Sequence, residues 1–524
     1  MRGCLLSFYL GSMPGVSEPG SVRESSGGPG TSANWRDWSR RRIPERLERM
    51  ELRYRGRTRS TAQPGQRPQP SVPAGTDLLP QIKHIVVLMM ENHSYDNYLG
   101  MLVGRGEGFP LDGDGQPAVT NLDAEGSPVR AHHLATTQQA EGAPCQSWHA
   151  SQVQWNQGKM DGFVASTEEV TPDADKAVGM GYWSEADLPF YYGLARTFPL
   201  ADHWFSSCLG PTFPNRRFLI AGTANGLVDD LPFHLLDYPQ NGTIFDMLTR
   251  HGISWANYHP VAGDKSRARR LAHYRRRRAR RTLGALGRGP RAVTDGVQKD
   301  IQFTADLFPL GIGQHMLHIH GIDQFFADAD AGTLPAFSLV DPAFEEFSEE
   351  NPQDIGKGES FAAEVINRVM HGKGWPDTLL IWTYDEHGGY YDHVPPPAAV
   401  PPDDVDGKTM AARPPWLQVA HRLLFPRHAK DAEQLDEDPM RYDRYGLRVP
   451  AVLVSPYARR DCVLSEVFDH TSVLKLIEEK WNLPALTRRD AAAASPIGAL
   501  DLSAPPAFRT PPELPAPGRG WGTW

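Results

Sequence analysis

Cysteine is scarce in this chain, with four residues among 524. So few cysteines exclude a disulfide-stabilised scaffold, and none of them forms the CxxC spacing of a zinc site. The chain also lacks an apolar run near the ~20 residues that cross a bilayer, which argues against an integral membrane protein. What remains is a chain long enough for one large domain or two of ordinary size.

Two common hydrolase signatures are missing as well. No GxSxG nucleophile elbow occurs, which argues against a Ser-His-Asp acyl hydrolase. His387 and His393 lack the HExxH spacing of a zinc hydrolase, and the glycines between them indicate a turn rather than a helix. Both of these reaction types therefore rank below the one that the remaining motifs favour.

Charge is distributed unevenly along the chain, although the formal net charge is only −9. Residues 1–75 contain 13 arginines against six acidic residues, and residues 265–291 contain 12 basic residues and no acidic one. The rest of the chain therefore has a net charge of −28. A nucleic-acid-binding protein usually carries positive charge on its folded surface. The acidic body thus predicts that nucleic acid is not a partner.

The first 75 residues are rich in Gly, Pro, Ser and Arg, and they predict a disordered basic extension. The apolar stretch Leu5–Leu10 is too short and broken for a signal peptide. Arg40–Arg42 could suggest twin-arginine export, but no apolar segment follows it. The sequence therefore gives no convincing export signal, and a cytoplasmic location is preferred to secretion.

A basic insertion occupies residues 264–300. One interpretation is a solvated or disordered excursion, because a run of like charges repels itself. The other is a patch that contacts anionic lipid head groups through residues 265–291, at about 1 kcal/mol per basic residue near such a surface. Both interpretations stay open at this point.

Three apolar runs of strand length predict buried strands of a parallel sheet: Ile82–Met90, Thr378–Tyr384 and Val449–Val454. Helical patterns lie at Glu359–Val369 and Thr471–Trp481, the second with Asp469 or Thr471 as its expected N-cap. Alternating strands and helices indicate an α/β fold with a doubly wound, mostly parallel sheet between helices. We expect one catalytic domain at 76–500 and a Pro-rich tail at 501–524.

Acidic side chains follow two of these strands directly. Glu91 and Asn92 come after the first strand, and Asp385 and Glu386 come after the second. Sites in such sheets lie beyond the carboxyl ends of the strands, so we expect these groups to meet there. Neighbouring carboxylates repel each other unless a cation neutralises them, and oxygen-rich clusters suit Ca²⁺, Mg²⁺ or Mn²⁺. A helix cap or a salt bridge is the alternative for a single acidic pair.

A third segment, Gly210–Arg216 (GPTFPNR), has the residue types of a phosphate site. Its two prolines predict a stiff loop, and Thr212 supplies a hydroxyl that a metal could activate as a nucleophile. Asn215 and Arg216 supply donors suited to phosphate oxygens. In isolation the same segment would predict only a turn bounded by prolines.

Five ordered motifs resemble the phosphoesterase family over about residues 80–495. They are Glu91–Gly100 (ENHSYDNYLG), Gly210–Arg216, Asp385–Val394 (DEHGGYYDHV), Val449–Pro456 (VPAVLVSP) and Phe468–Ser472 (FDHTS). That family includes bacterial non-haemolytic phospholipases C, plant non-specific phospholipases C and an acid phosphatase branch. The resemblance implies an alkaline-phosphatase-like α/β fold.

The resemblance also implies roles for individual residues. Glu91, Asp385 and Glu386 are expected to bind one divalent metal ion, Ca²⁺ as the first choice with Mg²⁺, Mn²⁺ or Zn²⁺ as alternatives. Asn92 is expected at the metal or the phosphate. Thr212 is the expected nucleophile, forming a covalent phospho-enzyme.

The histidines are harder to place. His149, after Trp148, resembles an upstream histidine of the family that binds phosphate or protonates the leaving group. Many relatives carry a His-Pro pair where this chain has Asn351 before proline, and an asparagine can bind phosphate but cannot titrate. The general acid would then be His149, His470 or His259, and helix capping is the alternative role for His470.

Taken with the resemblance, the sequence predicts a metal-dependent phosphoesterase, most of whose relatives are phospholipases C acting on glycerophospholipids. A phosphomonoesterase of the acid phosphatase kind is the alternative within the family. A non-catalytic protein that binds phosphate or lipid is the alternative outside it, favoured by Asn351 and by the basic insertion.

Overall fold

The computed structural model describes residues 67–140, 144–170, 175–230, 238–260, 308, 315–344, 346–407 and 441–519. Most of the predicted extension 1–75 and all of the predicted insertion 264–300 lie outside these residues. The described residues belong to one compact unit, Leu47–Trp524. Among their helices, none has both the length and the apolar character that crossing a bilayer requires.

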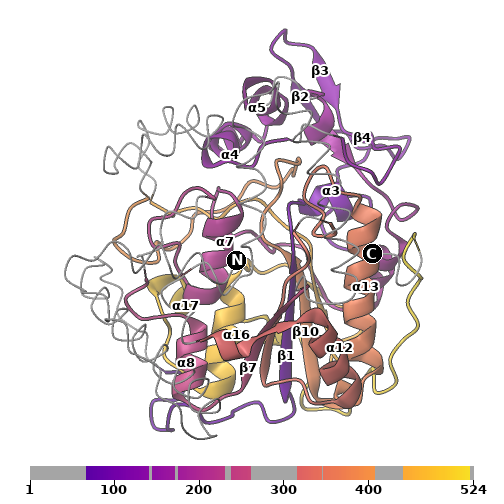
Figure 1. Ribbon diagram of the computed structural model, residues 1–524. Helices are drawn as coiled ribbons and strands as arrows, with labels where there is room; N and C mark the ends of the chain where they lie inside the picture. The colour runs from indigo at the N-terminus through magenta and orange to yellow at the C-terminus, as the bar shows by residue number, and fades with distance from the viewer. Residues whose placement is uncertain are drawn as a thin grey trace, which may run out of the picture. The chain divides into compact units, whose positions relative to one another are not determined.

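A mostly parallel sheet of eight strands forms the centre of this unit (Figure 1). In spatial order the strands are β12 (Val463–Leu464), β6 (Leu200–Ala201), β11 (Ala451–Val454), β10 (Thr378–Tyr384), β1 (His84–Met90), β9 (Phe337–Val340), β7 (Trp255–His259) and β8 (Ile319–Gly321). Only β11 runs antiparallel to its neighbours β10 and β6 in this part of the chain. The expected doubly wound, mostly parallel α/β sheet is confirmed.

The two central strands, β1 and β10, pair in parallel along their whole length, with Met90 opposite Tyr384. Every residue of the pair except His84 is buried. Burial on both faces explains why the two strands appear in the sequence as unbroken apolar runs. Because Met90 and Tyr384 are aligned, Glu91 and Asp385 leave the sheet at the same level.

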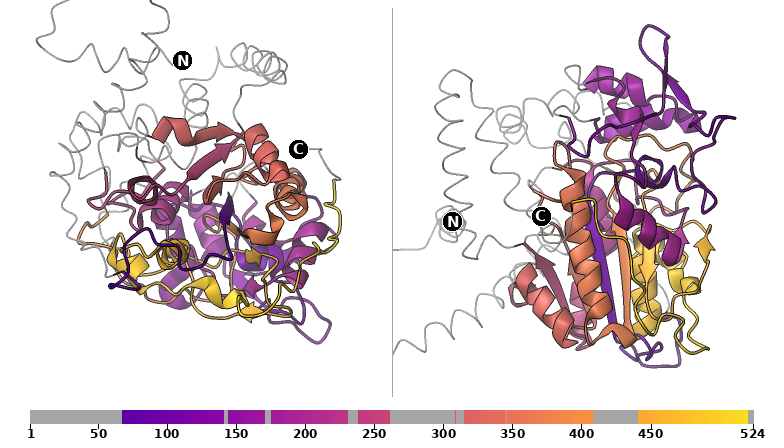
Figure 2. Two further views of the ribbon diagram at one scale, coloured as in Figure 1. Left: turned by 90° about the horizontal axis from the view of Figure 1, so that it is seen from below. Right: turned by 90° about the vertical axis from the view of Figure 1, so that its right-hand side faces the viewer.

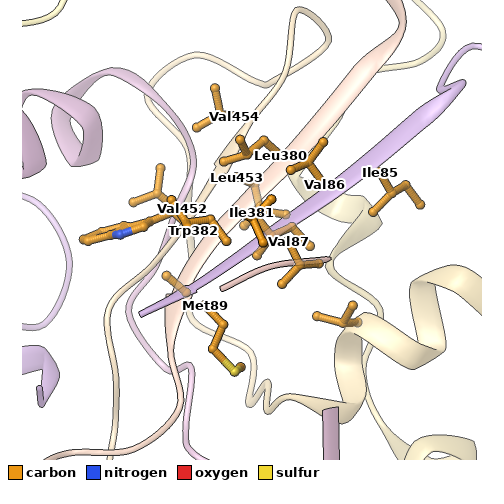
Figure 3. Packing of buried hydrophobic residues seen from close by; sticks show 14 of the residues in the cluster. Ile85, Val86, Val87, Met89, Leu380, Ile381, Trp382, Val452, Leu453 and Val454 are labelled. Carbon is orange, nitrogen blue, oxygen red and sulfur yellow. The ribbon is translucent and has the colours of Figure 1, made fainter. Parts of the chain in front are cut away.

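Helices cover both faces of the sheet (Figures 1 and 2). On one face α13 (Ile355–His371) contacts β1 and β10, with α12 (Ile322–Ala331) packed beside it. On the other face lie α16 (Thr471–Trp481) and α7 (Thr212–Ala221), which contact each other, and α8 (Ile244–Arg250). Branched side chains of β1, β10 and β11, such as Val87, Ile381 and Leu453, form the core between these layers (Figure 3).

Several predicted elements match the structure closely. The strand Thr378–Tyr384 and the helix Thr471–Trp481 are confirmed at both ends. The run that begins at Ile82 forms a strand only from His84 onward. The helix predicted to begin at Glu359 already begins at Ile355, because the Asp354 side chain caps it by accepting the Gly356 N–H.

Two local predictions are wrong. The segment Gly210–Arg216 is not a loop throughout, because helix α7 begins at Thr212 with Pro211 as its N-cap. Proline is compatible with the first helical turn, where its missing N–H would have no partner in any case. The N-cap of α16 is His470, and Asp469 instead accepts a hydrogen bond from the Thr471 hydroxyl.

Small elements between β1 and β6 lie at the carboxyl end of the central strands (Figure 1). They are α3 (Tyr95–Leu99), β2 (Thr120–Leu122), β3 (Pro128–Arg130), β4 (His132–His133), α4 (Trp148–Trp155) and α5 (Phe163–Val170), whereas α6 (Pro189–Thr197) contacts α13. Trp148, at the start of α4, packs close to Gly210 in the loop before α7. This group of elements therefore adjoins the strand ends where the predicted site residues lie.

Candidate active site

The ends of β1 and β10 bring four predicted site residues together. Glu91, Asn92, Asp385 and Glu386 are each at most 2% exposed. Asp385 Oδ1 accepts the backbone N–H of Asn92 at 3.2 Å and that of Glu386 at 2.8 Å. The carboxylate of Asp385 therefore joins the two strand ends that the sequence separates by nearly 300 residues.

A glycine turn after Glu386 fixes this arrangement. Gly388 has a φ of +65°, and a Cβ on it would lie 2.0 Å from the carbonyl oxygen of Asn92. Its N–H donates to Glu386 Oε2 at 2.6 Å. Asn92 itself has a φ of +69°, in the left-handed region that asparagine tolerates better than most residues. Gly388 therefore contacts the backbone of Asn92 and also bonds Glu386 Oε2, which holds these two groups close to each other.

Helix α7 is attached to the same edge through Arg216. Its Nε donates to Asp385 Oδ2 and its Nη1 to Asp341 Oδ1, both at 2.8 Å. Thr212 lies four residues earlier, so it shares a helix face with Arg216. The face of α7 that bonds Asp385 therefore also carries the predicted nucleophile.

The first turn of α7 is held from two further sides. Asn215 Oδ1 accepts the backbone N–H of Cys208 at 3.0 Å, and its Nδ2 donates to the Gly210 carbonyl at 2.8 Å. Asp230 Oδ1 accepts the backbone N–H of Phe213 at 2.7 Å. Thr212 is 5% exposed, and no described residue forms a hydrogen bond with its hydroxyl. The turn is thus rigidly placed while the hydroxyl itself stays available.

Four buried acceptor atoms at this edge lack a donor among the described residues. They are Glu91 Oε2, Asn92 Oδ1, Glu386 Oε1 and His470 Nδ1. The His470 ring lies beside them because its Nε2 bonds the Asp385 carbonyl at 2.7 Å, so in the neutral ring Nδ1 is an acceptor. Buried acceptors without donors are costly. Carboxylate and amide oxygens of this kind are what divalent cations bind in proteins, but no three of Glu91, Asp385, Glu386 and His470 have ligand atoms that all lie within 4.8 Å of one another.

The carboxyl groups of the site repel one another. Burial raises the pKa of Glu91 well above its usual range, and the charges of Glu350 and Asp385 raise it further. Burial and the Asp385 charge raise the pKa of Glu386 in the same direction. Burial, countered by the Phe213 N–H, raises the pKa of Asp230 to about 8. The site therefore concentrates negative charge that a bound cation would offset.

Other predicted site residues have partners elsewhere. His149 Nε2 pairs with Glu169 Oε1 at 3.1 Å on the surface of the α4–α5 layer. Asn351 exchanges hydrogen bonds with the Tyr390 hydroxyl, at 3.1 and 3.2 Å. The donors of Asn215 bond backbone carbonyls of its own loop. Their proposed contacts with phosphate would require these bonds to be exchanged.

Sequence reasoning missed three acidic groups of the site. Asp341 directly follows β9 and bonds Arg216, and the apolar run Phe337–Val340 before it could have revealed a third strand end. Glu350 and Asp230 approach the site from irregular segments, and both affect the pKa of neighbouring carboxyl groups there. No periodic pattern in the sequence indicates residues such as Glu350 and Asp230, which lie outside helices and strands.

A tighter acidic cluster lies outside the site. Ligand atoms of Asp96, Asp392 and His393 fall within 4.8 Å of one another, the one such group of three within the described ranges. Arg448 occupies this cluster, donating to Asp392 Oδ1 at 2.9 Å and to Asp96 Oδ1 at 3.1 Å. A buried guanidinium already balances the charge there, so the cluster is an ion-pair network rather than a cation site.

Comparison with known proteins gives a consistent set of relatives. The model described as Phosphoesterase family matches residues 82–484. Over 443 residues the chain is 28% identical to Non-specific phospholipase C6 of Arabidopsis thaliana, covering 79% of this chain and 71% of that protein. It is 30% identical over 427 residues to Non-hemolytic phospholipase C of Pseudomonas aeruginosa, covering 77% of this chain and 54% of that protein. Phospholipase C B of Mycobacterium tuberculosis is 28% identical over 460 residues, with 82% and 79% covered.

Among the solved structures that match is a protein in the alkaline phosphatase superfamily from Vibrio parahaemolyticus. The match covers 85% of this chain and 78% of that one, at 9% identity and a TM-score of 0.34. A score this low does not establish a common fold. The α/β assignment therefore depends on the strand order and the helix layers themselves.

Proposed function

This chain belongs to the Phosphoesterase family, and from that membership we propose that it is a metal-dependent phospholipase C acting on glycerophospholipids through Thr212. Hydrolysis of phosphoester bonds follows from the family and from its phospholipase C relatives. The choice of glycerophospholipids follows the names of those relatives and is part of the proposal.

One observation supports the mechanism above all others. Buried acceptors without donors, among them Glu91 Oε2 and Glu386 Oε1, lie at the sheet edge to which Arg216 attaches the helix of Thr212. A protein that only needed this fold would have little reason to keep such costly atoms unpaired. A cation beside a positioned hydroxyl explains both features at once.

The residues that would hold the ion are Glu91, Asn92 and Glu386, with Asp385 as the further member of the predicted set. Asp385 already accepts three hydrogen bonds, so its clearest role is to order its neighbours. A bound divalent ion would offset the carboxylates and stabilise negative charge on phosphoryl oxygens. Oxygen ligands favour Ca²⁺, Mg²⁺ or Mn²⁺, whereas participation of the His470 nitrogen would favour Mn²⁺ or Zn²⁺.

Thr212 performs the proposed covalent step. Its Oγ gives up its proton and attacks phosphorus in line, the bond from phosphorus to the glycerol oxygen breaks, and that oxygen takes up a proton so that diacylglycerol leaves. Water then cleaves the phosphoryl ester of Thr212 and frees the phosphorylated head group. Thr212 is the first residue of α7, so the positive end of the helix dipole faces the developing negative charge.

Replacing Thr212 with valine tests the nucleophile. Valine keeps the side-chain shape and removes the hydroxyl, so kcat should fall by more than about 1,000-fold while the thermal midpoint stays near that of the wild type. Thr197→Val is the matched control, because Thr197 lies in α6 and its hydroxyl bonds only the Gly193 carbonyl. Near-normal turnover by Thr212→Val would contradict the assignment.

Two substrates separate the alternatives. The purified protein is assayed with a phosphatidylcholine emulsion, followed by diacylglycerol release, and with p-nitrophenyl phosphate. Diacylglycerol release supports the phospholipase C proposal, whereas hydrolysis of p-nitrophenyl phosphate alone indicates a phosphomonoesterase. Hydrolysis of neither, with retained phosphate binding, indicates a non-catalytic binding protein.

Contact with anionic membranes through residues 265–291 and a cytoplasmic location stay predictions. The first depends on residues 265–291 and the second on the start of the chain, and both segments lie outside the described residues. The exclusion of nucleic acid likewise depends on charge alone.

A further inference from the structure

Arg216 is bonded along every edge of its guanidinium group. Besides Asp385 and Asp341, it donates through Nη2 to the carbonyl oxygens of Met90 at 3.1 Å and Met89 at 3.3 Å. One side chain therefore reaches the carboxyl ends of three neighbouring strands, β10, β9 and β1. A planar group with five donors is suited to such a task.

The flat face of the same guanidinium is covered as well. Its central carbon lies 4.7 Å from the centre of the Phe344 ring. The Arg216 side chain is 2% exposed, and the two carboxylates that it bonds are fully buried. A substrate phosphate would have to displace existing partners and enter a sealed space to reach this group. The contacts therefore disagree with the sequence-based expectation that Arg216 binds phosphate.

The position of Arg216 on α7 gives these bonds a second effect. Arg216 and Thr212 are one helical turn apart on the same face, so a rotation of α7 that moves one also moves the other. Asn215, between them in the chain, clamps the preceding loop through the Gly210 carbonyl. Together with the bonds of Asn215 and Asp230, the bonds of Arg216 thus fix the Thr212 turn relative to Asp385.

From these contacts we infer that Arg216 is a positioning residue, which fixes Asp385 and the Thr212 turn of α7 relative to each other and does not bind the substrate phosphate. The inference rests on the proposed role of Thr212 and deepens it. Misplacement of reacting groups by about 1 Å can cost roughly 100-fold in rate. The orientation of Arg216 should therefore matter more for turnover than for substrate affinity.

Arg216→Lys provides the main test. Lysine keeps the positive charge but cannot bond three strand ends at once. We expect kcat to fall roughly 100-fold, while KM and the inhibition constant of inorganic phosphate stay within about 3-fold of the wild type. Hydrogen exchange should also become faster in the first turn of α7, a change that does not depend on turnover.

Arg217→Lys is the matched control. Arg217 follows on the same helix and is also buried, but its guanidinium covers the Phe308 ring at 4.3 Å and bonds the Ala224 carbonyl. This variant should lose stability without a comparable loss of kcat. An equal kcat loss in both variants would overturn the inference, because it would then reflect a general weakening of α7.

Asp341→Asn gives an independent readout on a residue that carries no predicted phosphate contact. If Arg216 works by holding the strand ends, Asp341→Asn lowers kcat in the same direction, and the double variant loses less than the product of the two single effects.

Two results would overturn the inference outright. One is a rise in the phosphate inhibition constant that parallels the loss of kcat in Arg216→Lys, which would make Arg216 a phosphate ligand. The other is near-normal kcat in that variant. If the wild type hydrolyses neither substrate, the proposed function fails, but direct phosphate binding and hydrogen exchange still decide the role of Arg216.

Discussion

Single residues at the strand ends are constrained by backbone geometry as much as by chemistry. Gly388 shows this most clearly, because its positive φ and the carbonyl of Asn92 leave no room for a Cβ. The sequence motif therefore contains two kinds of residue: those proposed to bind a ligand, and those, such as Gly388, that are needed only because a side chain would not fit. A sequence pattern does not distinguish the two kinds.

Replacing Gly388 with alanine should disturb the site directly. The added Cβ would meet Asn92 and impose an unfavourable φ, which costs about 1–3 kcal/mol in addition to the clash. We expect a lower thermal midpoint and a loss of most phosphoesterase activity. Gly498→Ala is the control, since the nearest atom to its Cβ is 3.9 Å away. Equal behaviour of the two variants would contradict this interpretation.

Removal of the proposed metal ion should expose the repulsion among the carboxylates. The pKa of Glu386 is raised by burial and by Asp385, so the stability that it contributes is complete below about pH 4.5 and is lost as the pH rises through its higher folded-state value. In chelator, Glu386→Gln should therefore melt above the wild type at neutral pH, with the difference shrinking toward pH 4.5. Thermal scans with and without chelator measure this. A chelated wild type that melts above Glu386→Gln at neutral pH would contradict it.

At the scale of elements, the sequence predicts much of the fold and little of its connections. The runs at 82–90 and 378–384 predict β1 and β10 because both strands are buried on two faces. Nothing local states that these runs pair with each other, or that β11 runs antiparallel to β10. Strand order depends on contacts between distant segments, which periodicity does not encode.

In the candidate site, too, the sequence predicts the residues next to regular strands and fails for the others. Glu91, Asn92, Asp385 and Glu386 are placed correctly at one sheet edge, because residues after parallel strands meet there. Helix α7 was missed, because two prolines in seven residues indicate a turn unless the segment is already known to start a helix. Asp230 was missed because it reaches the site from outside the regular elements.

The network around Arg448 connects α3, the turn after β10 and the segment before β11. Burial would lower the pKa of His393, but the hydrogen bond and charge of Asp96 outweigh it and raise the value overall. With His393 protonated, the pair of Arg448 and His393 balances Asp96 and Asp392. The network is therefore most favourable at lower pH.

His393→Gln should reveal this balance as a pH-dependent loss of stability. The contribution of His393 is complete below about pH 6.5, the ordinary value, and is lost as the pH rises through its raised folded-state pKa. The difference in thermal midpoint between wild type and variant should thus be largest below pH 6.5 and shrink above it. His133→Gln is the control, because His133 pairs with Asp187 at a more exposed position. A difference that grows with pH would contradict the prediction.

At the scale of the whole molecule, a segment late in the sequence packs against the unit that contains the sheet. Residues 501–519, predicted as part of a Pro-rich tail, pack along the unit. The Gly518 N–H donates to the buried carboxylate of Glu359 at 2.9 Å, and the Trp375 indole donates to the Phe508 carbonyl at 3.0 Å. Proline-rich composition indicates an absence of helix and strand, and it does not exclude packing against a core.

Phe508 anchors this segment. Its side chain is 5% exposed, lies 4.9 Å from the Phe198 ring and is covered by the Arg460 guanidinium at 4.4 Å. Phe508→Ala should lower the free energy of unfolding by about 3 kcal/mol, in the range for large buried aromatics, as measured by urea denaturation. Phe508→Leu should lose clearly less, because it leaves a smaller cavity.

A measurement of kcat should show whether Phe508 affects stability without affecting the candidate active site. Trp375, which bonds Phe508, precedes the amino end of β10, whereas Asp385 follows its carboxyl end. Seven strand residues at about 3.3 Å each place the two ends roughly 20 Å apart. Below its melting range, Phe508→Ala should therefore keep kcat within about 2-fold of the wild type, since it removes no group near the reacting atoms. A large loss of kcat in a folded Phe508→Ala variant would show that the segment 501–519 is coupled to the strand ends through the sheet.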